Sequence, residues 1–276
     1  MSVINTNVAA IKARSNLERV QRDMDTSIAR LSSGKRITSA RDDAAGSAIV
    51  GRMDSQIRGL TMGIRHAKDG QSLVDTQEGA LQEVTALLQR MRELAVQAGS
   101  GVATNTDKNY LQVEMGHLVD EIDAISDSTK FNDQRVLTGA TFSFYTDIDV
   151  AGTAVTTVAA SAAAARIGIT KANVSIGAGT STNALLQAVI TKVDNAIGSI
   201  ASFRANLGAV SNRFDHLIDG LTNVVANTEA SKSRILDTDF SIETTQLTRN
   251  TVLQQAATSM VAQANAQKNA ILALIG

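Results

Sequence analysis

Glu114 and His117 have a spacing at which helical bundles bind metal. Carboxylate-bridged di-iron sites use Glu-x-x-His on one helix, but they need a second such pair and further glutamates. Neither His66 nor His216 has a glutamate three residues before it. The sequence therefore does not predict a metal site, and we expect no metal and no cofactor.

Asp42 and Asp43 are a second candidate, since adjacent carboxylates can bind a cation. No other ligand cluster is close to them in sequence, whereas Ser39-x-x-Asp42 has the spacing of a helix capping box. We therefore interpret this pair as a helix cap. The sequence also has no cysteine, no phosphate-binding glycine loop and no nucleophile elbow, so we expect no catalytic residue and no enzyme.

The elements that would hold such residues are mostly helices. Proline is absent, and an interior proline costs about 3 kcal/mol, so its absence favours long helices. Periodic apolar residues and breakers predict helices over 6–31, 44–98 and 107–127, a helix from 183 to a break at 236–241, and a terminal helix after that break, with Asp239 or Ser241 as its cap. We expect a mainly α fold, an elongated hairpin of long helices forming coiled coils and a bundle, with a small β-rich insert.

Three regions follow from this pattern. Terminal helices over 1–41 and 235–276 are expected to pair with each other, and 42–138 with 183–234 to form a helical bundle. The insert, 139–182, is expected to be exposed, with strands at 141–145, 153–158, 166–169 and 174–176. Its hydroxyls either carry O-linked sugars or are plain solvated side chains; they include Ser143, Thr153, Thr156, Thr157, Ser161 and Thr180.

The terminal stretch 250–276 carries one charged side chain, Lys268, and has apolar residues on several helix faces. Such a helix must be covered by protein. Its longest unbroken apolar run, Ile271–Ile275, is far below the ~20 residues that cross a bilayer. With the first helix it supplies the expected assembly core: Ile4, Ala13, Leu17, Val20, Met24, Leu31, Leu253, Ala257, Met260, Ala264, Ile271 and Leu274.

Charge and hydropathy limit the other partners. The formal net charge is −1, so no basic field predicts nucleic-acid binding. The N-terminus lacks the continuous apolar run of a secretory signal, and no transmembrane segment is expected, so we expect no membrane association.

The layout and several stretches resemble bacterial flagellin. Matching segments include Ile4-Asn-Thr-Asn7, Arg30-Leu-Ser-Ser-Gly34, Asp42-Asp-Ala-Ala-Gly46, Asn212-Arg-Phe-Asp215 and Leu253-Gln-Gln-Ala256. The resemblance covers roughly 1–138 and 183–276. It implies a structural subunit that self-assembles through both terminal helices into the flagellar filament used for swimming. A hook–filament junction protein is the alternative.

The resemblance also implies partners and a location. The chain would leave the cell through the flagellar type III export channel without a cleaved signal peptide. An export chaperone would hold the C-terminal segment, and the filament cap would receive the subunit. The filament is extracellular.

The segment Gln89–Gln97, with Glu114, resembles the part of flagellins that the vertebrate Toll-like receptor for flagellin detects in innate immunity. Leu81, Val84, Leu88, Met91, Ala95 and Ala98 form a seam that we expect to face the subunit's own core. Beside it runs a second stripe, at spacings of three and four. We interpret this stripe as a receptor contact, as a contact between subunits, or as both: Leu87, Arg90, Leu94 and Gln97, joined by Glu114.

Overall fold

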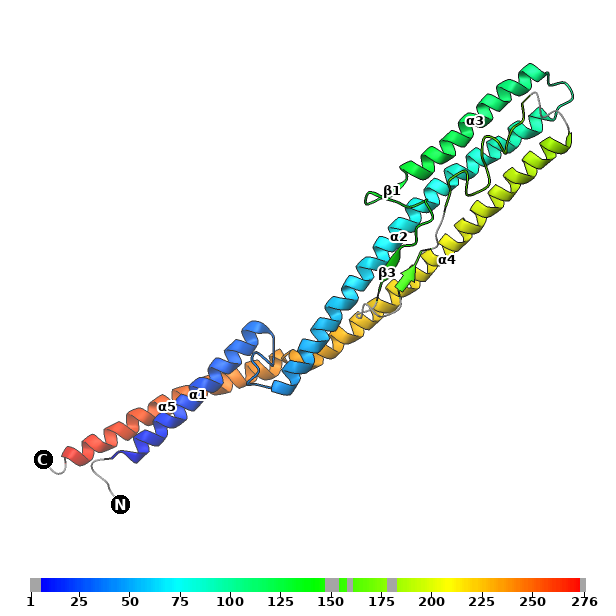
Figure 1. The fold of residues 1–276 in the computed structure, drawn as a ribbon. Helices are drawn as coiled ribbons and strands as arrows, with labels where there is room; N and C mark the ends of the chain where they lie inside the picture. Colours follow the sequence, from blue (N-terminus) through cyan, green and yellow to red (C-terminus); the bar gives the residue numbers. More distant parts are fainter. Residues whose placement is uncertain (1–5, 147–153, 158–160, 178–182, 274–276) are drawn as a thin grey trace. The chain divides into compact units, whose positions relative to one another are not determined.

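The computed structural model describes residues 6–146, 154–157, 161–177 and 183–273 (Figure 1). The described residues form five helices and two small antiparallel hairpins, which confirms a mainly α fold. The helices are α1 (Val8–Ser33), α2 (Ala44–Ala98), α3 (Asn105–Ser128), α4 (Asn183–Leu236) and α5 (Phe240–Ala273).

Polar caps and one glycine set the helix ends. Thr104 and Asp107 form the expected capping box of α3, each side chain bonding the other's backbone N–H. Asp239 Oδ1 accepts hydrogen bonds from the N–H groups of Ser241 and Ile242 and so caps α5. Gly34 ends α1 in the left-handed conformation (φ 69°), which a residue without a Cβ adopts at little cost.

Asp42 and Asp43 both cap, but at different places. Asp43 Oδ1 accepts from the N–H of Gly46 in the first turn of α2. Asp42 Oδ2 instead accepts from the backbone N–H and hydroxyl groups of both Thr38 and Ser39, over 2.9–3.2 Å. Asp42 therefore stabilises the turn that precedes α2, whereas Asp43 caps the helix itself.

This turn should depend on pH. The backbone N–H of Ser39, followed by the hydroxyl and N–H of Thr38, lowers the pKa of Asp42 from 3.8 to about 2. A lowered folded-state pKa stabilises the turn fully above pH 3.8, and this contribution is lost as the pH falls through about 2. A ¹³C NMR titration of the Asp42 carboxyl should show the low midpoint. The Asp42→Asn chain should lose the pH dependence, and a midpoint near 3.8 would contradict the expectation.

The chain forms two compact units. One comprises residues 1–57 and 226–276, and the other comprises 58–225. The long helices α2 and α4 each contribute residues to both units. The division that we expect from the sequence, at 41/42 and 234/235, concerns which segments assemble with other subunits, and it stays a prediction.

The unit 58–225 has a large apolar core. In it α2 lies between α3 and α4 (Figure 1), and buried residues of all three helices join one cluster, among them Leu88, Met115 and Ile200. Ion pairs run along the outside of both helix contacts, such as Arg92 Nε with Asp194 Oδ1 at 2.8 Å. The core thus consists of apolar contacts among the three helices, and charged pairs lie at its solvent-exposed edges.

The hairpin of β3 (Ser143–Tyr145) and β4 (Ala154–Thr156) packs onto this core and confirms two of the four expected strands. The Phe144 ring meets the buried Phe214 ring edge to face, with 5.8 Å between their centroids. A Cβ at Gly70 would lie 2.5 Å from the Phe214 ring, and one at Gly63 would lie 2.4 Å from the Thr146 carbonyl oxygen. These two glycines of α2 allow the close approach.

The other two expected strands are wrong. Residues 161–177 form turns and irregular chain, apart from an isolated bridge at Ser161. The expectation of an exposed insert is also wrong for this segment, because its apolar residues join the core: Ala162, Ala164, Ile167, Ile169, Val174 and Ile176. The apolar residues of this segment fill a groove among helices instead of one face of a sheet. Their pattern was therefore wrongly assigned to strands.

Polar residues of α3 hold this segment in place. Asp123 Oδ1 accepts from the Ala164 N–H at 2.8 Å, Asp120 pairs with Lys171 at 2.7 Å, and Gln112 accepts from the Ile176 N–H. They stand on one face of α3, so the segment runs antiparallel to this helix. Among the proposed sugar-bearing hydroxyls, Thr157 and Ser161 are buried, while Thr153 and Thr180 lie outside the described residues.

A hairpin of β1 (Lys130–Phe131) and β2 (Gln134–Arg135) was not expected. Its turn places Asn132 at φ 48° and Asp133 at φ 62°, which is a left-handed pair that β-hairpin turns require. Asn-Asp is a weaker turn signal than Asn-Gly, and two-residue strands carry no alternation.

Candidate functional site

In the unit 1–57 and 226–276, α1 and α5 lie side by side (Figure 1). One seam of α1, which carries the assembly-core residues predicted on this helix from Ala13 to Leu31, faces α5. Val20 and Ser27 are buried, and the other seam positions are half-buried: Ala10, Ala13, Leu17, Met24 and Leu31. These positions recur at three and four residues, which is the heptad pattern of a coiled coil.

The seam of α5 differs from the expected one. Its buried and half-buried positions again recur at four and three: Glu243, Leu247, Asn250, Gln254, Ala257, Val261 and Ala264. Ala257 and Ala264 of the proposed assembly core therefore face α1, whereas Leu253 and Met260 are 42% and 63% exposed. Ile4 and Leu274 lie outside the described residues, as does the side chain of Ile271.

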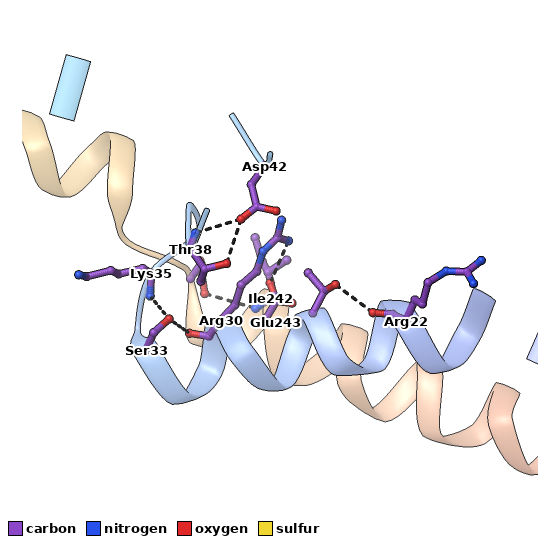
Figure 2. A network of polar contacts seen from close by, with 10 residues as sticks. Arg22, Arg30, Ser33, Lys35, Thr38, Asp42, Ile242 and Glu243 are labelled. Atoms are coloured by element: carbon purple, nitrogen blue, oxygen red, sulfur yellow. Dashed lines mark hydrogen bonds and ion pairs between the residues drawn. The ribbon is translucent and has the colours of Figure 1, made fainter. Parts of the chain in front are cut away.

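Polar side chains occupy much of this contact. Gln254 Nε2 donates to Gln21 Oε1 at 3.0 Å, and Asn7 Nδ2 donates to the Ala264 carbonyl at 3.0 Å. Arg30 of α1 points toward Glu243 of α5 (Figure 2), with 3.8 Å between Nη1 and Oε2. The contact between the two helices therefore combines apolar residues with hydrogen-bonded and charged side chains.

The short segment after α1 also contacts the short segment before α5. Lys35 and Asp237 form an antiparallel bridge. The Arg36 N–H donates to the Leu236 carbonyl, and the Thr238 N–H donates to the Gly34 carbonyl. The end of α1 and the start of α5 therefore lie next to each other in this unit.

Many large apolar side chains of this unit are exposed, and few are fully buried. Among its described residues only three apolar side chains are buried: Val20, Ile37 and Ile57. Nine large ones are exposed: Val8, Ile11, Ile28, Ile49, Phe240, Ile242, Val252, Leu253 and Met260. A surface with more apolar side chains outside than inside is typical of a protein interface.

The second predicted contact is the stripe on α2, and the structure places each of its residues. Arg90 Nε donates to Glu114 Oε1 at 2.9 Å and Nη1 pairs with Glu93 at 3.1 Å, so α2 and α3 bring these charges together. The bond to Glu114 is the main cause that raises the pKa of Arg90. Gln97 is exposed and Leu87 is half-buried against the core.

The predicted position of Leu94 is wrong. It was interpreted as lying off the internal seam, but its side chain is fully buried in the core of the unit 58–225. The reason is that α2 packs against two helices, α3 and α4, so it needs two adjacent apolar stripes. Leu94 is not accessible to a receptor or to another subunit.

The candidate metal residues are used otherwise. Glu114 is bound to Arg90, and His117 is exposed on α3. Among the residues that the structure describes, no group of three or more His, Cys, Asp or Glu side chains could hold a metal ion. Within the same residues, no helix has the length and hydropathy of a membrane span.

Both ends of the chain match known family models. Residues 4–141 match the bacterial flagellin N-terminal helical region, and residues 190–275 match the bacterial flagellin C-terminal helical region. The chain belongs to the bacterial flagellin family. The two matches include α1 and α5, whose pairing is described above.

Several flagellins are similar to this family member in sequence. It is 48% identical over 137 residues to flagellin 1 of Proteus mirabilis, a match covering 50% of this chain and 38% of that protein. It is 47% identical over 135 residues to the phase 1 flagellin of Salmonella naestved, covering 49% of this chain and 27% of that protein. The matches thus span about a third of these relatives' length.

Solved structures are similar as well. The crystal structure of Bacillus cereus flagellin is 31% identical and covers 59% of this chain and 94% of that one, with a TM-score of 0.49. The structure of a putative flagellar hook-associated protein from Vibrio parahaemolyticus is 12% identical. It covers 71% of this chain and 100% of that one, with a TM-score of 0.57, and this likeness concerns the fold alone.

Proposed function

We propose that this chain is a structural subunit that self-assembles through α1 and α5 into the extracellular helical filament of the bacterial flagellum. In this proposal the subunit has no catalytic role and its main partner is another copy of itself. Family membership and the names of its relatives support the proposal.

The observation that carries it is the apolar surface of the unit 1–57 and 226–276. Three apolar side chains are buried there and nine large ones are exposed, among the described residues. Covering one such leucine or isoleucine contributes about 1.5–3 kcal/mol. Neighbouring copies can supply this cover for both α1 and α5, and repetition along a filament multiplies the gain.

Seeded polymerisation tests this function. Purified chain is added to short filament fragments, and elongation is followed by electron microscopy and sedimentation. Filaments that grow with time and protein concentration are the expected result. A chain that stays soluble with active seeds, at concentrations where a related flagellin elongates them, would overturn the proposal.

A hook–filament junction protein is the alternative, because a hook-associated structure shares the fold. The higher sequence identity to flagellins favours the filament subunit. A junction protein should add to hook ends but not elongate filaments, so the same experiment separates the two functions.

The same proposal includes transient partners. An export chaperone would bind the exposed apolar face of α5, where Ile242, Leu253 and Met260 lie uncovered, until the subunit is exported. The filament cap would then receive the subunit at the growing end. Neither role requires a nucleic acid, a membrane or a cofactor.

Detection by the vertebrate Toll-like receptor for flagellin is also part of this proposal, with Arg90 and Glu114 as the contact. Arg90→Ala should weaken signalling by the free subunit about 30-fold, which corresponds to the ~2 kcal/mol of an interface hot spot, because it removes a planar donor from an exposed face. Reporter cells that express the receptor measure this. Arg65→Ala, an exposed arginine elsewhere on α2, should signal normally.

The stability of each variant must be measured beside signalling. Loss of the exposed Arg90 ion pairs should change stability little, because solvent screens pairs at the surface. Leu94→Ala should instead destabilise the core by about 2–5 kcal/mol, so weak signalling by that variant would not identify a contact. Normal signalling by a folded Arg90→Ala chain would refute the assignment.

A further inference from the structure

A polar, buried segment spans two successive heptad positions of the α1–α5 contact, and we call it the polar layer. Ser27 of α1 is 2% exposed, and Glu243 and Asn250 of α5 are 6% and 5% exposed. Arg30 completes the layer with its guanidinium directed at Glu243 (Figure 2). These residues lie around a groove of about 480 Å³, which Thr26 and Gln246 also line.

This layer is poorly suited to stabilising the pair. The Arg30–Glu243 distance is 3.8 Å, longer than a good charged hydrogen bond. Arg30 Nε and Asn250 Nδ2 are buried and have no hydrogen-bond partner among the described residues. Apolar residues of similar size at these positions would be expected to stabilise the contact equally well or better.

The rest of the seam has few register-specific side-chain contacts, namely the bonds of Gln254 with Gln21 and of Asn7 with the Ala264 carbonyl. Beyond the layer, α5 presents Ala257, Val261 and Ala264, and α1 presents mostly alanine and other medium-sized apolar residues. A slip of one heptad would place apolar residues against apolar residues again, at little cost. Backbone bonds also join the two helix ends: Lys35 bridges Asp237, and the N–H groups of Arg36 and Thr238 donate to the carbonyls of Leu236 and Gly34. Ten residues, 34–43, separate α1 from α2, so the covalent connection leaves room for α1 to slide.

We propose that the polar layer of Ser27, Arg30, Glu243 and Asn250 sets the register in which α1 pairs with α5. A one-heptad slip would bury the Glu243 carboxylate opposite residues that are not basic. A buried charge without its partner is costly, so the slipped states are disfavoured. A single polar position is known to fix register and partner number in coiled coils in this way. The consequence for filament order rests on the proposed function, whereas the register itself does not.

Distance measurements between spin labels test the proposal. The sequence has no cysteine, so single cysteines at the exposed Ser15 of α1 and Thr248 of α5 can be labelled without other changes. From the antiparallel pairing these sites are offset by roughly 16 Å along the axis, and a one-heptad slip changes the offset by about 10 Å. Pulsed electron spin resonance is recorded on the soluble chain and on filaments diluted with unlabelled chain.

The layer is removed in the triple variant Arg30→Met, Glu243→Leu and Asn250→Leu. We expect one narrow distance in the chain with the layer and at least two populations, separated by several ångströms, in the triple variant. Gln254→Leu is the matched control: it changes a polar seam residue outside the layer and should keep the single distance. Glu243→Leu alone leaves Arg30 unpaired and should lower the melting temperature of the pair, whereas the triple variant should not.

Two results would overturn the proposal. One is a single native distance in the triple variant; the other is a broad distribution in the parent chain, both free and assembled. Failure of the parent chain to elongate seeds, with its single distance intact and lost in the triple variant, would reject the filament function and leave the register assignment in place.

Discussion

Removal of Leu253–Gly276 should abolish filament growth. The deletion takes away the half of α5 that pairs with Ala10, Ala13 and Leu17, and with it the exposed Leu253 and Met260. Each large apolar side chain covered by a neighbour contributes about 1.5–3 kcal/mol, and every subunit would lose several. We expect no elongation of seeds by electron microscopy, at any concentration at which the full chain polymerises.

The unit 58–225 should remain folded in the shortened chain, because the deletion lies outside it. Tyrosine fluorescence reports on this unit specifically: the sequence has no tryptophan, and both tyrosines, Tyr110 and Tyr145, belong to it. Its urea unfolding curve should be unchanged. Elongation of seeds by the shortened chain would show that α5 is not the assembly element.

A pair of substitutions separates the outer face of α5 from its seam. Leu253→Ser with Met260→Ser changes two exposed side chains and should block assembly while α1 and α5 still pair. Gln255→Ser with Ala262→Ser changes two exposed positions on the same helix and should assemble normally. Equal behaviour of the two double variants would contradict an apolar interface on this face.

Phe214→Ala should destabilise the unit 58–225 by about 3–5 kcal/mol. Phe214 is fully buried, its ring meets Phe144 edge to face, and α2 offers only Gly70 at the point of closest approach. Removing the ring leaves a cavity that the helices can fill only partly, which adds to the lost transfer free energy. The midpoint of urea unfolding, followed by tyrosine fluorescence, measures the change.

Two further variants show whether the aromatic contact is responsible. Leu185→Ala removes a 48% exposed leucine from the same helix and should change stability by less than about 0.5 kcal/mol. Phe144→Ala combined with Phe214→Ala should cost less than the sum of the single changes, by about 0.5–1.5 kcal/mol. Full additivity would mean that the two rings act independently.

The sequence was sufficient for the helices and their ends. The α2 bounds, Ala44–Ala98, follow from the aspartates before it and the Gly99-Ser-Gly101 stop after it. The Thr104–Asp107 box was equally predictable, because a cap involves residues only three apart. The heptad seam of α1 was also correct, since a helix with one neighbour has one buried face.

The sequence could not decide which apolar residues face inward where an element has two neighbours or a mixed seam. Leu94 is in the core because α2 lies between two helices, and Leu253 is exposed because α5 turns a face containing Glu243 and Asn250 toward α1. Residues 161–177 became part of the core because α3 provides carboxylates and an amide that bind their backbone. Local propensity is read within a few residues, whereas these placements depend on partners that lie about 40 to more than 200 positions away in the chain.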